Sequence, residues 1–355
     1  MFAIGLGTPE NIQPTALAQL TGGNNGYILM TGNIGVDDYF LLTKYYQQIL
    51  AGITNMQIVV DPEGWLQPGA SVRIPFRVNE TDWQVDAVLH SPLPDAITYQ
   101  LETPDGQIID PGSLAGEPAS QFVTDQKSAF YRLSLPVSKV GAQHPQGVWH
   151  AILTLDARRF KRYLEKLKDD KTEYRMSQAH GLRYAFVAQA RSVLTMQTYL
   201  SQTSYEPGAM VQLRVVVTEY SYPAQRGGRV NVVVTSPDGS QTTYPAPETA
   251  DGIFEMHWVA ALSGVYRVHV LGSGMTTLGS RWTREALRSA IVWKGGDTKP
   301  PRPSDYERFC QLIGCWQKNG ALDAKRLQEL GINLTALRRC LCTPARTEQT
   351  GPQKG

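Results

Sequence analysis

An internal repeat of strands bounded by tight turns constrains the fold of this chain more than any other feature of its sequence. Each copy has a Pro-Gly turn before a long strand pattern, then a Pro-Asp-Gly turn, and then a strand that begins Gly-Val-aromatic. The matching pairs are LQPGASVRIPFRV (66–78) with YEPGAMVQLRVVV (205–217), TPDGQ (103–107) with SPDGS (236–240), and GVWHAIL (147–153) with GVYRVHV (264–270). Such turns between alternating strands predict antiparallel sheets in two tandem modules.

The repeat also sets the expected domain boundaries. We predict two β-sandwiches of the immunoglobulin type, one over 56–192 and one over 193–272. The first carries a helical insertion at about 157–176. We interpret 273–303, which ends in the polar and Pro-rich stretch WKGGDTKPPRP, as a linker that includes a short helix at TREALRSAIVW.

The insertion helix has one apolar face and one strongly basic face. Phe160, Tyr163, Leu164 and Leu167 recur at helical spacing, which predicts packing on the sandwich. The opposite face is a candidate contact for an anionic surface through Arg158, Arg159, Arg162 and Lys166. We favour a solvated face over this contact. Nucleic acid is not favoured as a partner, because the aromatic residues lie on the apolar face and the net charge is only +2.

All four cysteines lie in a C-terminal segment, 304–342, that we predict to be helical. A capping box formed by Ser304 and Glu307 begins it, and we expect the tail 343–355 to be disordered. Two alternatives stay open for the thiols: disulfides that join the first helix to the third, which imply an oxidising compartment, or reduced and packed side chains. Their spacing is poor for zinc. The candidates are Cys310, Cys315, Cys340 and Cys342.

Residues 1–55 have a different pattern, in which short apolar strands alternate with helices. The strands are expected in FAIGLG and GYILMTG, and an amphipathic helix in YFLLTKYYQQILAGI. Alternation of this kind predicts a parallel sheet with helices on its faces. Two strands are too few for a stable sheet, so we expect this segment to be poorly stable alone or to pack on the first sandwich.

The stretch FAIGLGTPENIQPTALAQLTGGNNGYILMTG, followed by a capped helix, resembles the C-terminal third of a von Willebrand factor A (VWA) domain. With the sandwiches that follow, the chain is similar to bacterial VWA-domain proteins and, more distantly, to the region after the A domain in calcium-activated chloride channel regulators. The resemblance implies a multidomain, mainly β protein. Its parts would be a partial α/β segment, two immunoglobulin-like sandwiches and a small helical C-terminal segment.

The same resemblance implies where a metal would bind. Such A domains hold a divalent cation through a DxSxS loop, and the sequence contains no DxSxS. We therefore assign no metal ligand and no cofactor to this chain, and we expect Mg²⁺ only in a full-length relative that carries the loop. Asp37 and Asp38 are interpreted as helix caps.

Motifs of common enzymes are missing from the sequence. It has no HExxH and no GxSxG, and its histidines are not paired at helical spacing. The glycines of Gly5-Leu6-Gly7 lack the third glycine of a dinucleotide fingerprint, because position 10 is Glu. We assign no catalytic residue and predict that the chain is not an enzyme.

These observations favour a non-catalytic protein-binding or scaffold region of a VWA-domain protein, with another protein as its partner. The alternative is a non-catalytic accessory region of a chloride-channel-regulator-like metalloprotease whose catalytic module lies upstream. An extracellular or cell-surface location is favoured. No apolar run approaches the roughly 18 residues that a membrane span needs.

Overall fold

The computed structural model describes most of the chain in detail. Described are residues 2–7, 27–32, 39–115, 117, 119–137, 145–297, 312, 315, 316, 327, 328 and 333. The chain divides into two units, Met1–Asp297 and Thr298–Gly355. In the second unit, the described residues Leu312, Cys315, Trp316, Leu327 and Gln328 are helical. The rest of the predicted segment 304–342 and the tail 343–355 lie outside the described residues.

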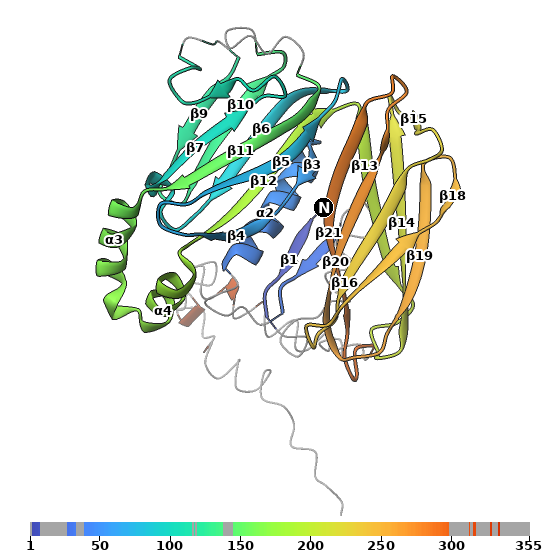
Figure 1. Cartoon of the computed structure of the whole chain (residues 1–355). Helices are drawn as coiled ribbons and strands as arrows, with labels where there is room; N and C mark the ends of the chain where they lie inside the picture. Colours follow the sequence, from blue (N-terminus) through green and yellow to red (C-terminus); the bar gives the residue numbers. More distant parts are fainter. Residues whose placement is uncertain are drawn as a thin grey trace, which may run out of the picture. The chain divides into compact units, whose positions relative to one another are not determined.

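The first sandwich packs two antiparallel sheets face to face (Figure 1). One sheet has the order β3 (Gln57–Val60), β12 (Leu182–Ser192), β6 (Asp82–His90), β10 (Ser128–Ser134) and β9 (Gln121–Thr124), with β4 (Glu63–Leu66) also paired to β12. The other has the order β5 (Ser71–Val78), β11 (Gly147–Leu155), β7 (Ile97–Glu102) and β8 (Ile108–Ile109). Their facing side chains form one core, in which Trp149, Tyr131 and Phe186 are fully buried.

The second sandwich has the same two-layer construction. One sheet has the order β13 (Leu194–Gln202), β14 (Ala209–Glu219), β19 (Ile253–Ala260) and β18 (Glu248–Ala250), with β15 (Tyr222–Pro223) beside β14. The other has the order β17 (Gln241–Ala246), β16 (Arg229–Thr235), β20 (Gly264–Met275) and β21 (Arg281–Val292). Buried residues alternate with more exposed ones along the whole of β14, so one face of the strand lies in the core. The mainly β architecture built from antiparallel sheets is thus confirmed.

Two of the three repeat matches lie at equivalent places in the two sandwiches. The Pro-Asp-Gly turns follow β7 and β16, and each of these strands pairs with a Gly-Val strand, β11 or β20. A Cβ on Gly147 would lie 2.8 Å from Pro104, and one on Gly264 would lie 2.6 Å from Pro237, so each turn proline packs where only glycine fits.

The third match does not correspond in space. β5 follows the first Pro-Gly turn and lies at the edge of its sheet beside β11, whereas β14 follows the second and lies between β13 and β19 in the opposite layer. The shared Pro-Gly sequence specifies the turn but not the strand that pairs with its neighbour. The correspondence of 66–78 with 205–217 is therefore a likeness of local sequence only.

The predicted boundary at 272 is wrong, because the second sandwich continues to Val292. β20 runs to Met275, and β21 pairs with it antiparallel over twelve residue pairs from Gly264–Val292 to Met275–Arg281. Residues 273–292 are therefore neither linker nor helix. Glu, Ala, Leu and Arg have high helix propensity, but the hydrogen bonds to β20 and the alternating burial along β21 outweigh it.

The insertion is helical as predicted but ends later than 176. It comprises α3 (Ala157–Lys166), a 3₁₀ turn (Leu167–Asp169) and α4 (Lys171–His180). The side chain of Asp156 accepts hydrogen bonds from the main-chain N–H groups of Arg158 and Arg159 and so caps α3. Phe160 is buried in the core of the first sandwich.

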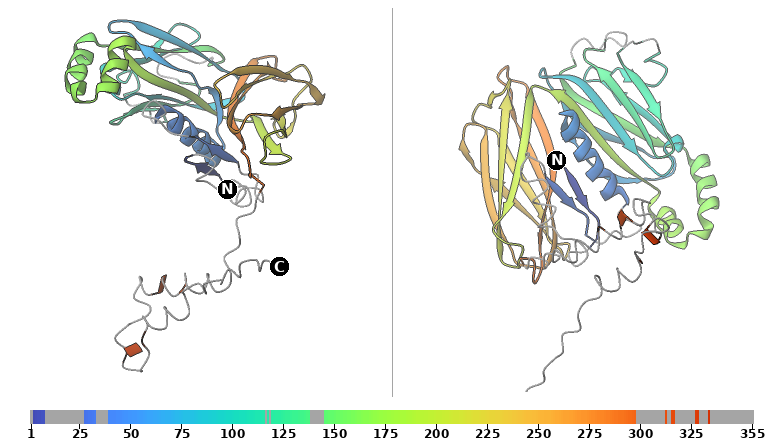
Figure 2. Two further views of the ribbon diagram at one scale, coloured as in Figure 1. Left: turned by 90° about the horizontal axis from the view of Figure 1, so that it is seen from below. Right: turned by 180° about the vertical axis from the view of Figure 1, so that it is seen from behind.

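In its described residues, the N-terminal segment consists of a two-stranded parallel sheet and one helix. β1 (Ala3–Gly5) and β2 (Ile28–Met30) pair in parallel, as their predicted order requires, and α2 spans Tyr39–Thr54. The predicted intervening helix and the caps Asp37 and Asp38 lie outside the described residues. β2 contacts β21, while α2 contacts β3, β12 and β21 (Figures 1 and 2). The segment therefore packs on both sandwiches, and not on the first alone.

Candidate functional site

The candidate site is the three-way junction, which we define by β2 and α2, by β3, β6 and β12 of the first sandwich, and by β13 and β21 of the second. β21 contacts each of the other parts of the junction: β2 and α2, β3 of the first sandwich, and β13. Inward-facing residues of β21 alternate as Trp282, Arg284, Ala286, Arg288 and Ala290, so two arginines occupy positions that are usually apolar. The opposite face presents Glu285, Leu287 and Ser289 to the N-terminal segment.

A buried ion pair joins the two sandwiches. Arg284 is 1% exposed, and its Nη2 donates to Asp82 Oδ1 at 2.6 Å and to Ser192 Oγ at 3.0 Å. Asp82 begins β6 of the first sandwich, and its second oxygen accepts a hydrogen bond from the main-chain N–H of Asn79 at 3.0 Å. Thr81 Oγ1 lies 2.8 Å from Ser192 Oγ and extends the network. The guanidinium thus links β21 of the second sandwich to β6 and β12 of the first by charge-assisted hydrogen bonds.

Long polar side chains also close the open edge of the second sandwich between β13 and β21. Arg288 Nε donates to the carbonyl oxygen of Thr198 at 3.3 Å. Gln202 bonds both main-chain groups of Ile291, donating to O at 2.7 Å and accepting from N at 3.3 Å. These bonds satisfy strand-edge groups that would otherwise be left for pairing with another chain.

The N-terminal segment is bound to β21 by specific hydrogen bonds. Ser289 Oγ accepts from Met30 N at 2.8 Å and donates to Ile28 O at 3.2 Å, so it acts as the neighbour that β2 lacks on that side. Gln48 Oε1 accepts from Leu287 N at 3.1 Å. Tyr45 donates to Met30 O at 3.1 Å and thereby ties α2 to β2.

The buried face of the predicted amphipathic helix α2 is not made of apolar residues alone. Tyr45 is buried, but Tyr46 and Leu50 are 59% and 46% exposed. Gln48, a polar residue, is only 4% exposed because its side chain bonds to β21. The helix therefore packs through a face centred on Tyr45 and Gln48.

A buried carboxyl group lies where α2 meets β3. Asp61 is 4% exposed, and Lys44 Nζ donates to its main-chain oxygen at 2.7 Å and lies 3.3 Å from Oδ1. Burial raises the pKa of Asp61 to about 7 in spite of the Lys44 charge, and the Glu285 carboxylate adds to the rise. Glu285 itself lies 2.8 Å from His269 Nε2.

The pKa of one histidine in the junction, His90, is lowered. His90 Nε2 lies 3.0 Å from the amide nitrogen of Gln47, so the ring nitrogen accepts this hydrogen bond and the ring is neutral. Burial lowers the pKa of His90 to about 4. The junction thus holds two titratable groups, Asp61 and His90, whose uncharged forms the fold favours.

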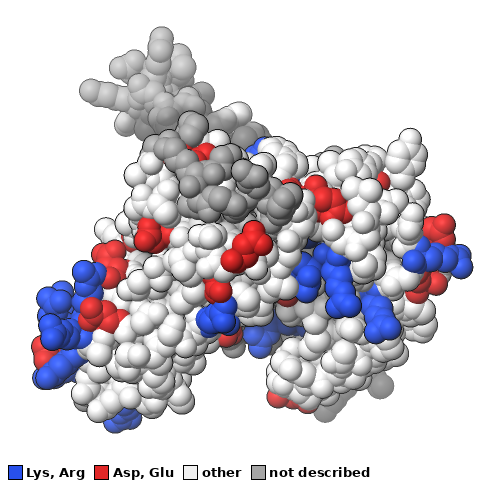
Figure 3. All heavy atoms as spheres, turned by 45° about the horizontal axis from the view of Figure 1, so that its top comes forward, with Lys and Arg blue, Asp and Glu red and all other residues white. Residues whose placement is uncertain are grey.

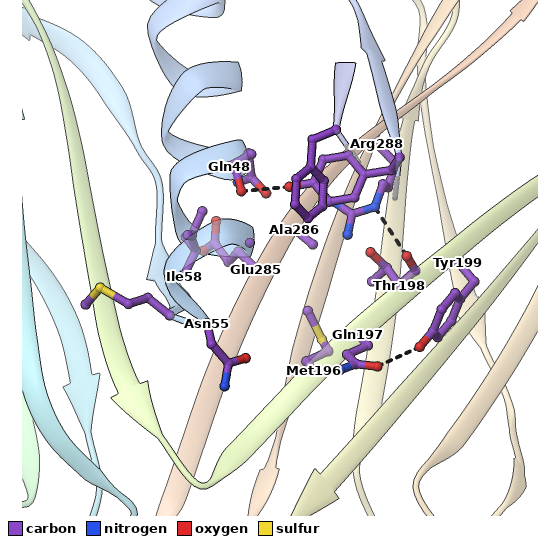
Figure 4. A pocket seen from close by; sticks show the side chains of 15 residues that line it. Gln48, Asn55, Ile58, Met196, Gln197, Thr198, Tyr199, Glu285, Ala286 and Arg288 are labelled. Atoms are coloured by element: carbon purple, nitrogen blue, oxygen red, sulfur yellow. Dashed lines mark hydrogen bonds between the residues drawn. The ribbon is translucent and has the colours of Figure 1, made fainter. Parts of the chain in front are cut away.

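A pocket of about 200 Å³ opens between α2, β13 and β21 (Figure 4). Its polar lining includes Gln48, Thr198, Glu285 and Arg288, and its apolar lining includes Phe2 and Met196. The ring of Tyr27 covers the Arg288 guanidinium at 3.7 Å. Burial lowers the pKa of Arg288, and the nearby Tyr27 partly counters that effect.

The described residues include no group of three or more His, Cys, Asp or Glu side chains placed to hold a metal ion. Among the described helices, none combines the length and the apolar character that a bilayer span requires.

The structure places the predicted site residues away from the junction. Arg158, Arg159, Arg162 and Lys166 are exposed on α3, and basic side chains gather on that side of the molecule in Figure 3. Arg159 also donates to the carbonyl oxygen of Asp95. Of the cysteines, Cys315 is the one within the described residues; Cys310, Cys340 and Cys342 lie outside them, so the disulfides stay a prediction.

Sequence reasoning missed the residues that build the junction. Asp82, Ser192, Thr198, Arg284 and Arg288 belong to no motif, and they come from strands far apart in the chain. A period-two pattern of large and small residues from Trp282 to Ala290 was available as a signal. A strand with one buried face is usually recognised because every second residue is apolar. Arg284 and Arg288 occupy two of these positions, so the pattern does not indicate a strand clearly.

Comparisons with known proteins assign no family. No protein-family model and no curated protein matches the sequence. Among solved structures, the chain is similar to the lipase BlEst2 of Bacillus licheniformis in propeptide form, with 12% identity, a TM-score of 0.34, and coverage of 68% of this chain and 42% of that one. It is also similar to a DUF4785 family protein from Legionella pneumophila, with 12% identity, a TM-score of 0.40, and coverage of 67% and 63%.

A β-glucuronidase of Ruminococcus gnavus is a third similar structure, with 10% identity, a TM-score of 0.21, and coverage of 62% of this chain and 35% of that one. The chain thus spans less than two thirds of the length of each of these proteins. Similarity at this level does not transfer an activity.

Proposed function

We propose that this chain is a non-catalytic scaffold in which two β-sandwiches hold an α/β segment in a defined orientation for a protein partner. The observation that carries the proposal is the attachment of β2 and α2 to β21. Met30 bonds to Ser289, 259 positions away, and Gln48 bonds to Leu287, 239 positions away. Hydrogen bonds of this kind constrain direction as well as distance, as an orienting scaffold needs.

We also propose that both sandwiches are of the immunoglobulin type. In support, Tyr266 donates to the carbonyl oxygen of Leu262 at 3.0 Å, a bond of the tyrosine-corner kind. Trp149, the matching residue of the first sandwich, donates in the same way to Pro145 O at 2.7 Å. The layers of the second sandwich, with β13, β14, β19 and β18 opposite β20 and β16, follow the strand arrangement of that type.

The proposal of a VWA-like α/β segment is supported by the parallel pairing of β1 with β2 and by the helix that follows them. An accessory region of a chloride-channel-regulator-like metalloprotease is the alternative, and the sandwiches would hold the α/β segment in the same way there. In either case, a divalent cation would bind only in a relative that carries the DxSxS loop.

The scaffold proposal is tested by replacing Ser289 with Ala. The substitution removes the acceptor of the Met30 N–H and the donor to Ile28 O, and a buried donor without a partner costs about 1–3 kcal/mol. We expect amide exchange at Leu29 and Met30 to become about tenfold faster or more, while Val215 in the second core keeps its protection. Hydrogen exchange followed by mass spectrometry or NMR measures both sites.

Ser201→Ala serves as the matched control, because Ser201 is exposed on β13. It should leave the exchange of all three amides unchanged. The scaffold proposal fails if Leu29 and Met30 already exchange at the rate of an unfolded chain in the wild-type protein, or if Ser289→Ala does not accelerate them.

A further inference from the structure

We propose that the pocket between α2, β13 and β21 binds a small carboxylate, with the Arg288 guanidinium as its counter-charge. This function goes beyond the scaffold role and does not depend on it. The ligand would enter beside Tyr27 and place its acidic group against Arg288, Gln48 and Thr198, all of which line the pocket (Figure 4).

Arg288 is the first observation that points to an anion. Arg288 is only 9% exposed. Its hydrogen bonds go to carbonyl oxygens, from Nε to Thr198 at 3.3 Å and from Nη1 to Leu287 at 2.7 Å, and its plane lies against the Tyr27 ring. Among the described residues, no carboxylate forms an ion pair with it. Buried arginines are nearly always paired with an acidic group, so the buried charge of Arg288 indicates that an acidic group binds beside it.

Arg284, two inward positions earlier on the same strand, shows what the usual arrangement is. It is also buried, at 1% exposure, and its Nη2 lies 2.6 Å from Asp82 Oδ1. The acid nearest to Arg288 in the pocket lining is Glu285, whose carboxylate lies 2.8 Å from His269 Nε2. The difference that matters here is that Arg284 has a carboxylate partner, whereas no carboxylate among the described residues pairs with Arg288.

Two neutral groups supply the second, independent observation. Within the described part of the chain, Gln48 Nε2 and Thr198 Oγ1 have no hydrogen-bond partner, although Gln48 and Thr198 are only 4% and 6% exposed. The amide orientation of Gln48 is set, because its oxygen accepts from Leu287 N. Buried donors are normally satisfied, so two such groups beside an unpaired guanidinium indicate a binding site.

A carboxylate fits this set of donors. Its two oxygens accept about four hydrogen bonds, and a guanidinium, an amide NH₂ and a hydroxyl can each donate to them. The pocket of about 200 Å³ admits a short ligand, and Phe2, Met196 and Ala286 offer apolar contact to an aliphatic chain. The acid can be a free metabolite-sized molecule or the C-terminal carboxylate of a peptide.

Binding is tested with two acids and their amides by isothermal titration calorimetry on the whole chain. The probes are butyrate with butyramide, and N-acetyl-trialanine with its C-terminal amide. We expect saturable binding of at least one acid and none of its amide. Butyrate alone identifies a small acid as the ligand, and tighter binding of the peptide acid identifies a chain terminus. Failure of both acids, or equal binding of acid and amide, overturns the proposal.

Matched threonine variants locate the site on β13. Thr198→Val removes the unpartnered hydroxyl from the pocket, whereas Thr195→Val removes one that pairs with Thr218 at 2.8 Å outside the pocket. We expect Thr198→Val to weaken binding of the acid by about tenfold, and Thr195→Val to leave it unchanged. Equal weakening by both variants overturns the assignment.

Arg288→Lys adds a test of the counter-charge. Lysine keeps the positive charge and loses the planar fork, so binding should weaken by about tenfold while a neutral probe still shows no binding. Because Arg288 also bonds to β13, the melting temperature of this variant is measured alongside. A folded Arg288→Lys protein with unchanged affinity for the acid contradicts the proposal, and Thr198→Val decides the question if the lysine variant does not fold.

Discussion

Asp82→Asn should lower the free energy of unfolding by about 3–5 kcal/mol, because it leaves the buried guanidinium of Arg284 without its counter-charge. Both side chains are nearly inaccessible, at 1% and 0% exposure, so water cannot replace the lost partner. The pair also joins β6 to β21, and its loss should loosen the contact between the sandwiches. Urea denaturation followed by tryptophan fluorescence measures the change.

Two further variants make this result specific. Arg226 and Asp251 are also 2.6 Å apart, but both are largely exposed, so Arg226→Gln should leave stability unchanged within error. The double variant Asp82→Asn with Arg284→Met removes the orphaned charge and should recover much of the loss. If Asp82→Asn costs no more than Arg226→Gln, the ion pair does not hold the sandwiches together.

Asp61→Asn should make the protein more stable than the wild type at pH 8, by on the order of 2–4 kcal/mol. The pKa of Asp61 is about 7 in the folded state, whereas the ordinary value for an aspartate, 3.8, applies to the unfolded state. Between these two pH values the folded protein therefore holds one more proton than the unfolded protein. Its contribution to stability is fully present below pH 4 and is lost as the pH rises through 7. Asparagine keeps the neutral form at every pH. Unfolding curves from pH 4 to 9 measure the difference.

His90 changes stability with pH in the direction opposite to Asp61, so the two effects have to be measured separately. Its pKa is lowered from 6.5 to about 4, so its contribution is present above pH 6.5 and is lost as the pH falls through 4. Between pH 4 and 6.5 the two slopes offset each other in the wild type. Stability should therefore rise with pH in Asp61→Asn and fall with pH in His90→Gln. The side chains whose charge acts on Asp61 are Lys44, Glu285 and His269, and Glu63 Oε2 lies 3.9 Å from Lys44 Nζ.

The pH assignment is contradicted if Asp61→Asn follows the wild-type curve over the whole range. A parallel shift of the curve, with unchanged slope, would mean that Asp61 acts through packing. The difference in slope between the wild type and Asp61→Asn from pH 4 to 7 is therefore the decisive quantity, because it counts the proton that Asp61 takes up on folding.

Local patterns predicted much of the fold. The Pro-Asp-Gly turns, the Gly-Val strands, the insertion helix with Phe160 inward, and the helix at 39–54 all depend on residues close together in sequence. The segment 283–293 shows the limit of such reasoning. Its composition favours a helix, but twelve residue pairs with β20 make it a strand. The candidate site was not predictable, because its residues lie on segments that meet only after folding.

The sequence by itself determined the mainly β architecture, since turn residues and alternation act within a few positions. Only the tertiary structure decided where the second sandwich ends, which face of α2 is buried and how the three segments join. Arg284, Arg288 and Gln48 are polar residues whose burial is favourable only with partners 90 to more than 200 positions away. No local pattern carries that information, because the free energy of a buried polar group depends on the partner and not on the neighbours in sequence.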